Sequence, residues 1–412
     1  MTDFDVVVVG AGLGGACAAL ALSQRGVRVA LMEAARFPRH KVCGEFLSPE
    51  IRRTFRRLKI EDKVLQGAPA SVQVARVVAS SAQSSTRSLE IALPQGAIGL
   101  SRYGLDQILW DATERSGVQM FGETRVRTVE KTDGHFVVRN SSGEDVRAQF
   151  VLAAPGRNVR LGDERPAEIE YSNGGQNSNG GQNSNGAHHN LNNVQNSNGT
   201  RDSSSSSRPA RRYVGFKTHF AGVRGVANAV ELYPFEGGYC GVGGIENGIT
   251  NVCLLARYEA VNGRAPDEFW RWLMQQCPAL KARLKDATPL MSWLATANIS
   301  FGLAQPTRAD GVLLCGDAGG YIHPLTGDGM AMAARSGELA ASIVAASLRG
   351  GLNREAVAPL YERAWRREFA NRLHWATRLE PLLTDPRLAR LAVQTFSCAP
   401  SLGRLAVAAT RG

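Results

Sequence analysis

The sequence predicts an α/β protein in three parts: a three-layer domain, a second domain with a mixed β-sheet inserted into it, and a C-terminal helical segment. A strand, a glycine turn, a helix and another strand open the chain, which is typical of a doubly wound sheet. A β-rich middle and a Leu-, Ala- and Arg-rich end follow. The 412 residues, 43% hydrophobic and 21% charged, allow about two or three domains and exclude disordered and collagen-like chains.

The three-layer domain is expected from residues 1–71, 101–171 and 302–348. Its opening unit is a strand over 4–9, a helix over 14–24 and a strand over 27–33, which is a Rossmann-like start. Apolar alternation and helical spacing predict its other elements: helices at 51–58, at 105–116 and from Asp328 onward, and strands at 124–131, 135–140, 150–153 and 311–315.

The inserted domain is expected from residues 72–100 and 211–301. Its patterns predict β-like runs at 72–100, 213–220, 229–233 and 238–255, a helix at 266–276 and a strand at 295–301. Segment 172–210 repeats SNGGQN in tandem and contains a run of serines. Because it can bury almost nothing apolar, we predict a disordered insertion there. The C-terminal helical segment is 349–412.

The formal net charge is +11, and after residue 348 there are 11 Arg against 5 Asp and Glu. No aromatic residues are interleaved with the basic clusters, so solvated helix faces are favoured over a nucleic-acid surface; contact with an anionic membrane stays open. The seven cysteines have neither CxxC nor metal-ligand spacing, so we expect no disulfide framework and no metal. Without a leader or an apolar stretch of about 18 residues, we expect a cytoplasmic protein, with a peripheral membrane location as the alternative.

Gly10, Gly12 and Gly15 form a GxGxxG pattern between the first strand and the first helix. The first glycine allows a tight turn, the second the close approach of a pyrophosphate, and the third close packing of the helix. Glu33 ends the second strand, where a carboxylate accepts hydrogen bonds from an adenosine ribose. The pattern predicts a site for FAD or NAD and disfavours NADP; a turn that serves packing alone is the alternative.

The run CGDAGGYIHPLTGDGM occupies residues 315–330. Together with GxGxxG, it resembles flavoproteins of the para-hydroxybenzoate hydroxylase superfamily, which hold FAD in an extended conformation. The resemblance implies that Asp317 binds the ribitol and that the segment from Pro324 through Gly327 and Gly329 to Met330 wraps the isoalloxazine. A helix start at this place would offer free N–H groups to the negative charge of a reduced flavin.

Two further segments resemble the same superfamily. SRYGLD at 101–106 is similar to its arginine-bearing helix start, so Arg102 is expected at the cofactor, with an ion pair to Asp106 as the alternative. The segment 154–160 keeps Gly156 but has Pro155 where hydroxylases use an Asp for FAD and NADPH, which weakens a hydroxylase assignment. We also expect cofactor contacts from Arg39 and Val126.

Within the superfamily, FPRHKVCGE at 37–45 resembles the geranylgeranyl reductase branch, whose cysteine lies beside flavin and substrate. The resemblance makes Cys43 the catalytic candidate; a small packed residue is the alternative. Glu45 and His323 are candidate acids, and His323 can equally be a hydrogen-bonding residue of its loop. The stretch 232–241 is similar to the branch's substrate strand but lacks the Trp of its aromatic signature.

These motifs predict an FAD-dependent oxidoreductase that transfers a hydride from reduced flavin to a C=C bond of a hydrophobic substrate, isoprenoid-like or a secondary metabolite. The first alternative is an FAD-dependent monooxygenase that uses NAD(P)H and O₂, and the second is a non-catalytic flavin- or lipid-binding relative. Halogenases of this fold carry a lysine and a Trp-rich motif that we do not find. Because no second dinucleotide fingerprint is present, NAD(P)H would bind only transiently as electron donor.

Overall fold

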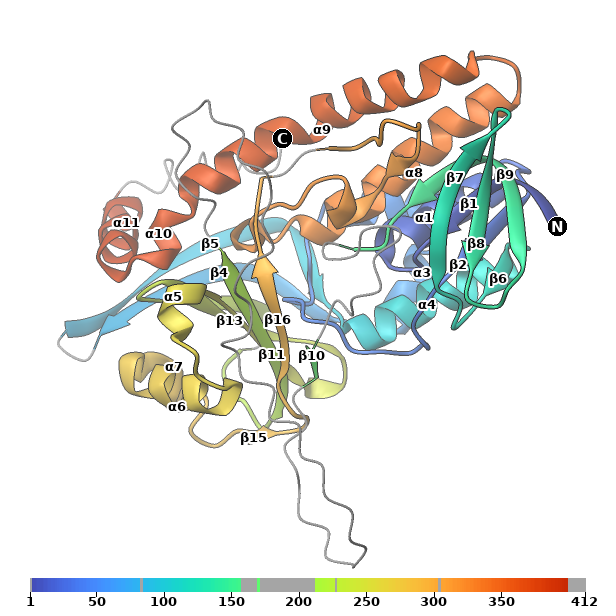
Figure 1. The fold of residues 1–412 in the computed structure, drawn as a ribbon. Coiled ribbons are helices and arrows are strands. Elements are labelled where there is room, and N and C mark those ends of the chain that lie inside the picture. The colour runs from blue at the N-terminus through green and yellow to red at the C-terminus, as the bar shows by residue number, and fades with distance from the viewer. Residues whose placement is uncertain are drawn as a thin grey trace, which may run out of the picture.

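The computed structural model describes residues 2–81, 84–156, 169–170, 212–226, 228–302 and 305–398. The predicted insertion at 172–210 lies outside the described residues, as does the end of the predicted C-terminal segment after residue 398. The described strands form two mixed sheets with helices packed around them (Figure 1), which confirms the predicted α/β class.

The first sheet has a parallel centre and an antiparallel end. Its order is β6-β2-β1-β9-β8-β7, and β17 pairs with the end of β9. In β1, Val6 and Val8 pack on the helices at one face, whereas Val7 and Val9 pack on side chains of β7 and β8 at the other. This alternation produces the three layers. The strands are β1 (Thr2–Val9), β2 (Val29–Met32), β6 (Gln119–Phe121), β7 (Val126–Thr132), β8 (His135–Asn140), β9 (Asp145–Ala153) and β17 (Leu313–Leu314).

Helices pack on the first sheet, and two of them, α1 and α8, are rich in small residues. Gly337 of α8 packs so closely on α1 that a Cβ there would lie 2.0 Å from the Gly14 carbonyl oxygen. Helix α4 begins before the predicted residue 105 because the Ser101 hydroxyl accepts a hydrogen bond from the Gly104 N–H, 3.0 Å away, and caps it. The helices of this part are α1 (Leu13–Ser23), α2 (Ile51–Arg57), α3 (Glu61–Gln66), α4 (Arg102–Arg115) and α8 (Gly329–Leu348).

The second sheet has the order β10-β16-β11-β14-β13-β12-β4-β5-β3, with β15 paired to β11. Only β4 and β12 run parallel among its described pairs. The β-like run predicted at 238–255 is a hairpin that turns at the short helix η2 (Glu246–Gly248). The strands are β3 (Phe46–Leu47), β4 (Ala70–Ser81), β5 (Ser84–Gly99), β10 (Ile169–Glu170), β11 (Tyr213–Ala221), β12 (Asn228–Phe235), β13 (Gly238–Gly244), β14 (Thr250–Arg257), β15 (Thr288–Pro289) and β16 (Leu294–Ile299).

Strand β11 has two unlike faces. Phe216 and Phe220 face a core formed with helices on the outer side of the sheet. Gly215, Lys217 and His219 alternate with them and therefore face inward, where Gly215 lies beside Val42, which precedes β3 in the chain. The outer helices are α5 (Tyr258–Val261), α6 (Pro266–Gln276) and α7 (Pro278–Arg283).

The C-terminal helices join the two sheets. Helix α9 (Val357–Leu379) packs along α8, and α10 (Pro381–Thr384) and α11 (Pro386–Cys398) then lie against strands of the second sheet, among them β4, β5 and β12 (Figure 1). Among the described residues, no helix combines the length and the apolar character needed to cross a membrane. The remaining short helices are η3 (Gly316–Ala318), η4 (Pro324–Thr326) and η5 (Arg354–Ala356).

Candidate active site

The glycine turn leaves space at one position and none at the other two. A Cβ on Gly10 would lie 2.4 Å from the Ala154 carbonyl oxygen, and one on Gly15 would lie 1.8 Å from the Gly10 carbonyl oxygen. At Gly12 the nearest atom is Nη2 of Arg102, 3.8 Å away. Helix α1 starts after Gly12 without a side-chain cap, so its first N–H groups are available to a ligand.

Glu33 is bound to the glycine turn by its carboxylate. Oε2 accepts from the N–H of Ala11 at 2.7 Å, and Oε1 accepts from the N–H of Ala35 at 2.8 Å. Arg39 places Nη2 3.9 Å from this carboxylate, and its Nε is buried without a hydrogen-bond partner among the described residues. A buried donor without a partner is costly, so this position suits a polar ligand atom.

A cavity of about 360 Å³ connects the two sheets. At one end, which we call the cofactor end, Gly12, Arg102, Gly156 and Asp317 line it. The remainder, which we call the apolar arm, runs between the second sheet and the C-terminal helices. Aliphatic and aromatic side chains line this arm, among them Val77, Leu89, Ile91, Leu93, Val230, Leu232, Leu382, Leu383, Val393 and Phe396.

Arg102 is buried at the cofactor end. Its Nε and Nη2 donate to the two oxygens of Asp106, at 2.8 and 2.7 Å. Although burial opposes the charge, Asp106 raises the pKa of Arg102 well above its usual value, so the residue is a fixed cation. The ion pair weighed from the sequence is therefore present, and the same guanidinium faces Gly12.

The loop before α8 is shaped by Gly327 and held by Asp328. Gly327 has φ +66, and a Cβ there would lie 2.7 Å from the ring of Phe46. The Asp328 carboxylate accepts from Ser48 Oγ at 3.0 Å and from Arg372 Nη1 at 2.7 Å. Burial raises the pKa of Asp328 to about 6 even though Arg372 lowers it. Because no side chain caps α8, its first N–H groups remain available at the cavity.

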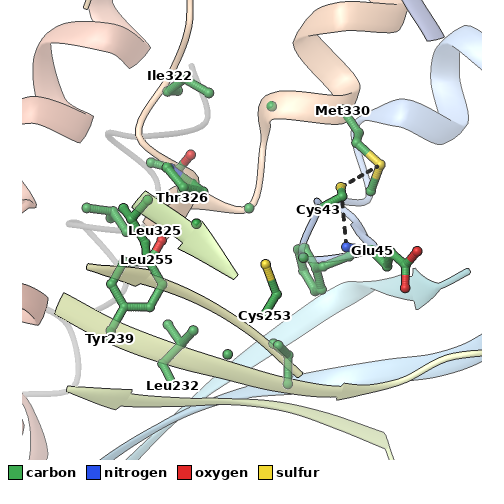
Figure 2. A pocket seen from close by; sticks show the side chains of 18 of the residues that line it. Cys43, Glu45, Leu232, Tyr239, Cys253, Leu255, Ile322, Leu325, Thr326 and Met330 are labelled. Carbon is green, nitrogen blue, oxygen red and sulfur yellow. Dashed lines mark hydrogen bonds between the residues drawn. The ribbon is translucent and has the colours of Figure 1, made fainter. Parts of the chain in front are cut away.

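Cys43 lies in a turn at the cavity wall (Figure 2). Its thiol donates to the Met330 thioether across 3.8 Å, and its sulfur accepts from the N–H of Glu45 at 3.4 Å. The amide of Asn251 donates to the Cys43 carbonyl oxygen at 3.2 Å. The turn is thus tied both to the helix α8 and to β14 of the second sheet.

Glu45 is the centre of a buried charged cluster. Its side chain is 0% exposed, as is that of Lys217, whose ammonium donates to Oε1. Oε1 also accepts from the N–H of Arg102 at 2.7 Å, and Oε2 accepts from His219 Nε2 at 2.7 Å. Burial by itself raises the pKa of Glu45, but Lys217 and His219 outweigh burial and hold it below the usual value. Glu45 is therefore a carboxylate at neutral pH.

Lys217 and His219 were not singled out from the sequence. Their signal is a short polar stretch, 217–219, inside the otherwise apolar run YVGFKTHF at 213–220, in which Lys217 and His219 share one face if the run is a strand. That pattern does not reveal the partner, because Glu45 lies 172 positions away along the chain.

Residues 3–373 match the model of the FAD binding domain family. The chain belongs to this family. It is an FAD-dependent oxidoreductase, and the superfamily expected from the motifs is confirmed.

This flavoenzyme is 23% identical over 393 residues to digeranylgeranylglycerophospholipid reductase 2 of Methanopyrus kandleri, covering 93% of this chain and 87% of the relative. The solved structure of the flavin-dependent brominase Bmp2 matches with a TM-score of 0.75 at 17% identity, over 99% of this chain and 93% of that chain. PqsL of Pseudomonas aeruginosa, described as a probable FAD-dependent monooxygenase, matches with a TM-score of 0.69 at 19% identity, over 96% and 100%. Since these proteins carry three different descriptions, the likeness selects no single reaction.

The cofactor end of the flavoenzyme fits FAD. Gly12 leaves room beside an uncapped helix, Glu33 can also bind a ribose, and Arg39 Nε lacks a partner among the described residues. Most residues expected from the sequence at cofactor or substrate line the cavity: Gly12, Cys43, Glu45, Arg102, Gly156, Asp317, Pro324, Gly327, Gly329 and Met330.

Other candidates of the flavoenzyme lie behind the cavity wall. Gly10 and Gly15 serve the packing of the turn, and Val126 packs on the core below the first sheet. His323 is buried, with its ring centroid 4.4 Å from that of Phe301, and Nδ1 accepts from the Leu325 N–H at 3.4 Å. Burial lowers the pKa of His323 to about 4, so its ring is neutral at pH 7. His323 is also not among the residues that line the cavity.

Proposed function

We propose that the protein reduces a C=C bond of an apolar substrate. The observation that carries the proposal is that the cofactor end and the apolar arm belong to one cavity. FAD in its reduced form supplies a hydride for such a step. A long apolar molecule in the arm reaches the loop Pro324–Met330 with its end, and by the resemblance described above the isoalloxazine lies at this loop.

The walls of the arm would bind the substrate and exclude water. Leu232 and Leu255 contribute from the sheet, and Leu383 and Val393 contribute from the helices opposite. Burial of apolar surface stabilises a complex by about 25 cal/mol per Å², so such a site binds hydrocarbon without any charged anchor.

Cys43 and Glu45 have different tasks in this proposal. The Cys43 thiol lines the cavity and can give a proton to the substrate carbon. Glu45 is held ionised by Lys217 and His219, so it is a positioning residue that keeps the turn in place and does not donate the proton. His323 supports the loop by its bond from Leu325.

The test uses the flavin-loaded protein, photoreduced without oxygen and mixed with geranylgeraniol as the probe. We expect the absorbance of oxidised flavin to return without oxygen and the product to gain two hydrogen atoms, one from the hydride and one from the proton. Cys43→Ser should slow the return about tenfold or more. If the absorbance returns only with oxygen and the product gains an oxygen atom, the protein is a monooxygenase. Replacing photoreduction with NADH or NADPH identifies the electron donor.

A further inference from the structure

Tyr239 is a mostly buried tyrosine whose hydroxyl has no hydrogen-bond partner among the described residues. The residue is 5% exposed and lies on β13, paired with Leu255 of β14. Its side chain rises from the sheet toward the loop that carries Leu325 (Figure 2), and its ring centroid is 6.0 Å from that of His323. Within the described part of the chain, no hydrogen bond joins the Tyr239 hydroxyl to another residue, although the residue lines the cavity.

Such a hydroxyl is expensive to leave in an apolar wall. Leu232, Leu255 and Leu325 surround the ring of Tyr239. Hydroxyls in an apolar wall are normally hydrogen-bonded, and because Tyr239 lines the cavity, its partner there would be a ligand or water. On the same strand face, Gly241 and Gly243 follow Tyr239 and leave the floor of the cavity open beside it. The hydroxyl is therefore placed to meet a ligand.

The other polar groups nearby are already engaged. The Thr326 hydroxyl donates to the His323 carbonyl oxygen at 3.2 Å and accepts from the Asp328 N–H at 3.4 Å. Glu45 is engaged by Lys217 and His219, and Arg102 is paired with Asp106 at the cofactor end. Burial raises the pKa of Tyr239 well above its usual value, so the phenol keeps its proton and acts as a donor.

The charge of the walls limits what the ligand atom can be. The charged residues among the cavity lining are Lys41, Glu45, Arg102 and Asp317. Arg102 faces Gly12, and the Lys41 ammonium lies 3.4 Å from the Cβ position of Gly156, so both cations belong to the cofactor end. An anionic group in the apolar arm would have no counterion from the described wall.

We propose that Tyr239 donates a hydrogen bond to an uncharged oxygen of the substrate, so that the substrate class is a lipophilic chain bearing a carbonyl or quinone oxygen near the flavin end. This rests on the proposed function, which places an apolar substrate in the arm. It adds a specificity-determining residue, because a site with a buried donor rejects the analogue that lacks the acceptor.

The experiment compares two probes of the same chain, farnesal with a carbonyl and the hydrocarbon farnesene, by their dissociation constants for the flavin-loaded protein. We expect the wild type to bind farnesal about fivefold or more tightly than farnesene. Tyr239→Phe should bring this ratio to about one and leave farnesene binding unchanged, since only an oxygen atom is removed. Tyr258→Phe, an exposed tyrosine on α5, is the matched control and should keep the ratio.

Two results would overturn the inference, and they differ from failure of the proposed function. If farnesene binds but the preference for farnesal survives Tyr239→Phe, Tyr239 does not bind the carbonyl oxygen. The same follows if the wild type binds farnesene and farnesal equally well. If farnesene does not bind the wild type at all, the apolar arm is not a substrate site and both proposals fall. Flavin content and melting temperature of Tyr239→Phe, expected to equal those of the wild type, show that the variant is folded.

Discussion

Gly12 and Gly15 belong to one turn but are required for different reasons. Gly12→Val should give a folded protein without FAD. A Cβ at this position has only Arg102 Nη2 nearby, 3.8 Å away, so the fold tolerates the side chain, but the side chain fills space that the ligand needs. Gly15→Ala should lower the free energy of unfolding by about 3 kcal/mol or more, because its Cβ collides with the Gly10 carbonyl oxygen. Urea unfolding and the ratio of flavin to protein absorbance check both; a Gly12→Val protein that retains full flavin contradicts the cofactor assignment.

The Glu45 cluster makes a prediction about both stability and pH. Glu45→Gln leaves the Lys217 ammonium buried without a counterion, which should cost about 3–5 kcal/mol at pH 7. Because the folded pKa of Glu45 is lowered, its contribution is present above the unfolded pKa of about 4.3 and is lost as the pH falls through the lower folded pKa. The difference between the free energies of unfolding of wild type and variant, measured with urea, should therefore become smaller at acidic pH.

The double variant Glu45→Gln with Lys217→Met is the control for this cluster. Removing both charges should recover part of the lost stability, since the unpaired ammonium is then gone. If the double variant is as unstable as the sum of the two single variants, the charges do not interact and the cluster described here does not govern the turn.

At the scale of elements, α11 offers a matched pair of positions. Val393 is 2% exposed and lines the apolar arm, whereas Leu391 is 59% exposed on the other face of the same helix. Val393→Asn should weaken the binding of farnesene about tenfold or more, because an amide is placed in an apolar wall. Leu391→Asn should leave the dissociation constant unchanged. Equal losses in the two variants would show that α11 does not cover the ligand.

The helices and strands could be predicted from the sequence better than the contacts between them. The apolar run Val6 to Val9 and the small residues of α1 are local patterns, so the opening unit and its glycine turn could be predicted directly. The helical C-terminal segment was also predicted, but its place over the second sheet follows from packing that no local pattern records. Cys43 and Glu45 belong to a local motif and could be named in advance, whereas Lys217 and His219 belong to none. Tyr239 lies in the stretch 232–241 that resembles a substrate strand, but it was not named as a site residue.

At the scale of the whole molecule, the chain passes between its sheets more often than the predicted domain boundaries suggest. Strand β3 follows the Cys43 turn at once and pairs with β5 of the second sheet. Strand β10 joins the second sheet from residues 169–170, beside β16. Both segments were expected with the first domain, whose boundaries stay a prediction. This arrangement depends on strand pairings between residues far apart in the sequence. The periodicity within one segment gives no information about which distant segment it pairs with.

These crossings predict that the two sheets unfold together. FAD added to the stripped protein at 100 times its dissociation constant should raise the free energy of unfolding by about 2.7 kcal/mol. Because the cavity that contains the cofactor end connects the two sheets, near-ultraviolet circular dichroism and flavin fluorescence should follow the same urea transition. Two separate transitions in the flavin-loaded protein, with only one of them shifted by FAD, would mean that the sheets are independent folding units.

The contact between Cys43 and Met330 bears on how long the enzyme stays active in air. Two oxidisable sulfur atoms stand 3.8 Å apart in the wall of the chamber where a reduced flavin would meet dissolved oxygen. A sulfenic acid or a sulfoxide at either atom would insert an oxygen into a contact that has no room for one. Oxidation by flavin that reacts with oxygen would therefore fall on the cavity wall at Cys43 and Met330, and if the proposed function holds, the protein should stay active longest when a substrate in the apolar arm takes the electrons first.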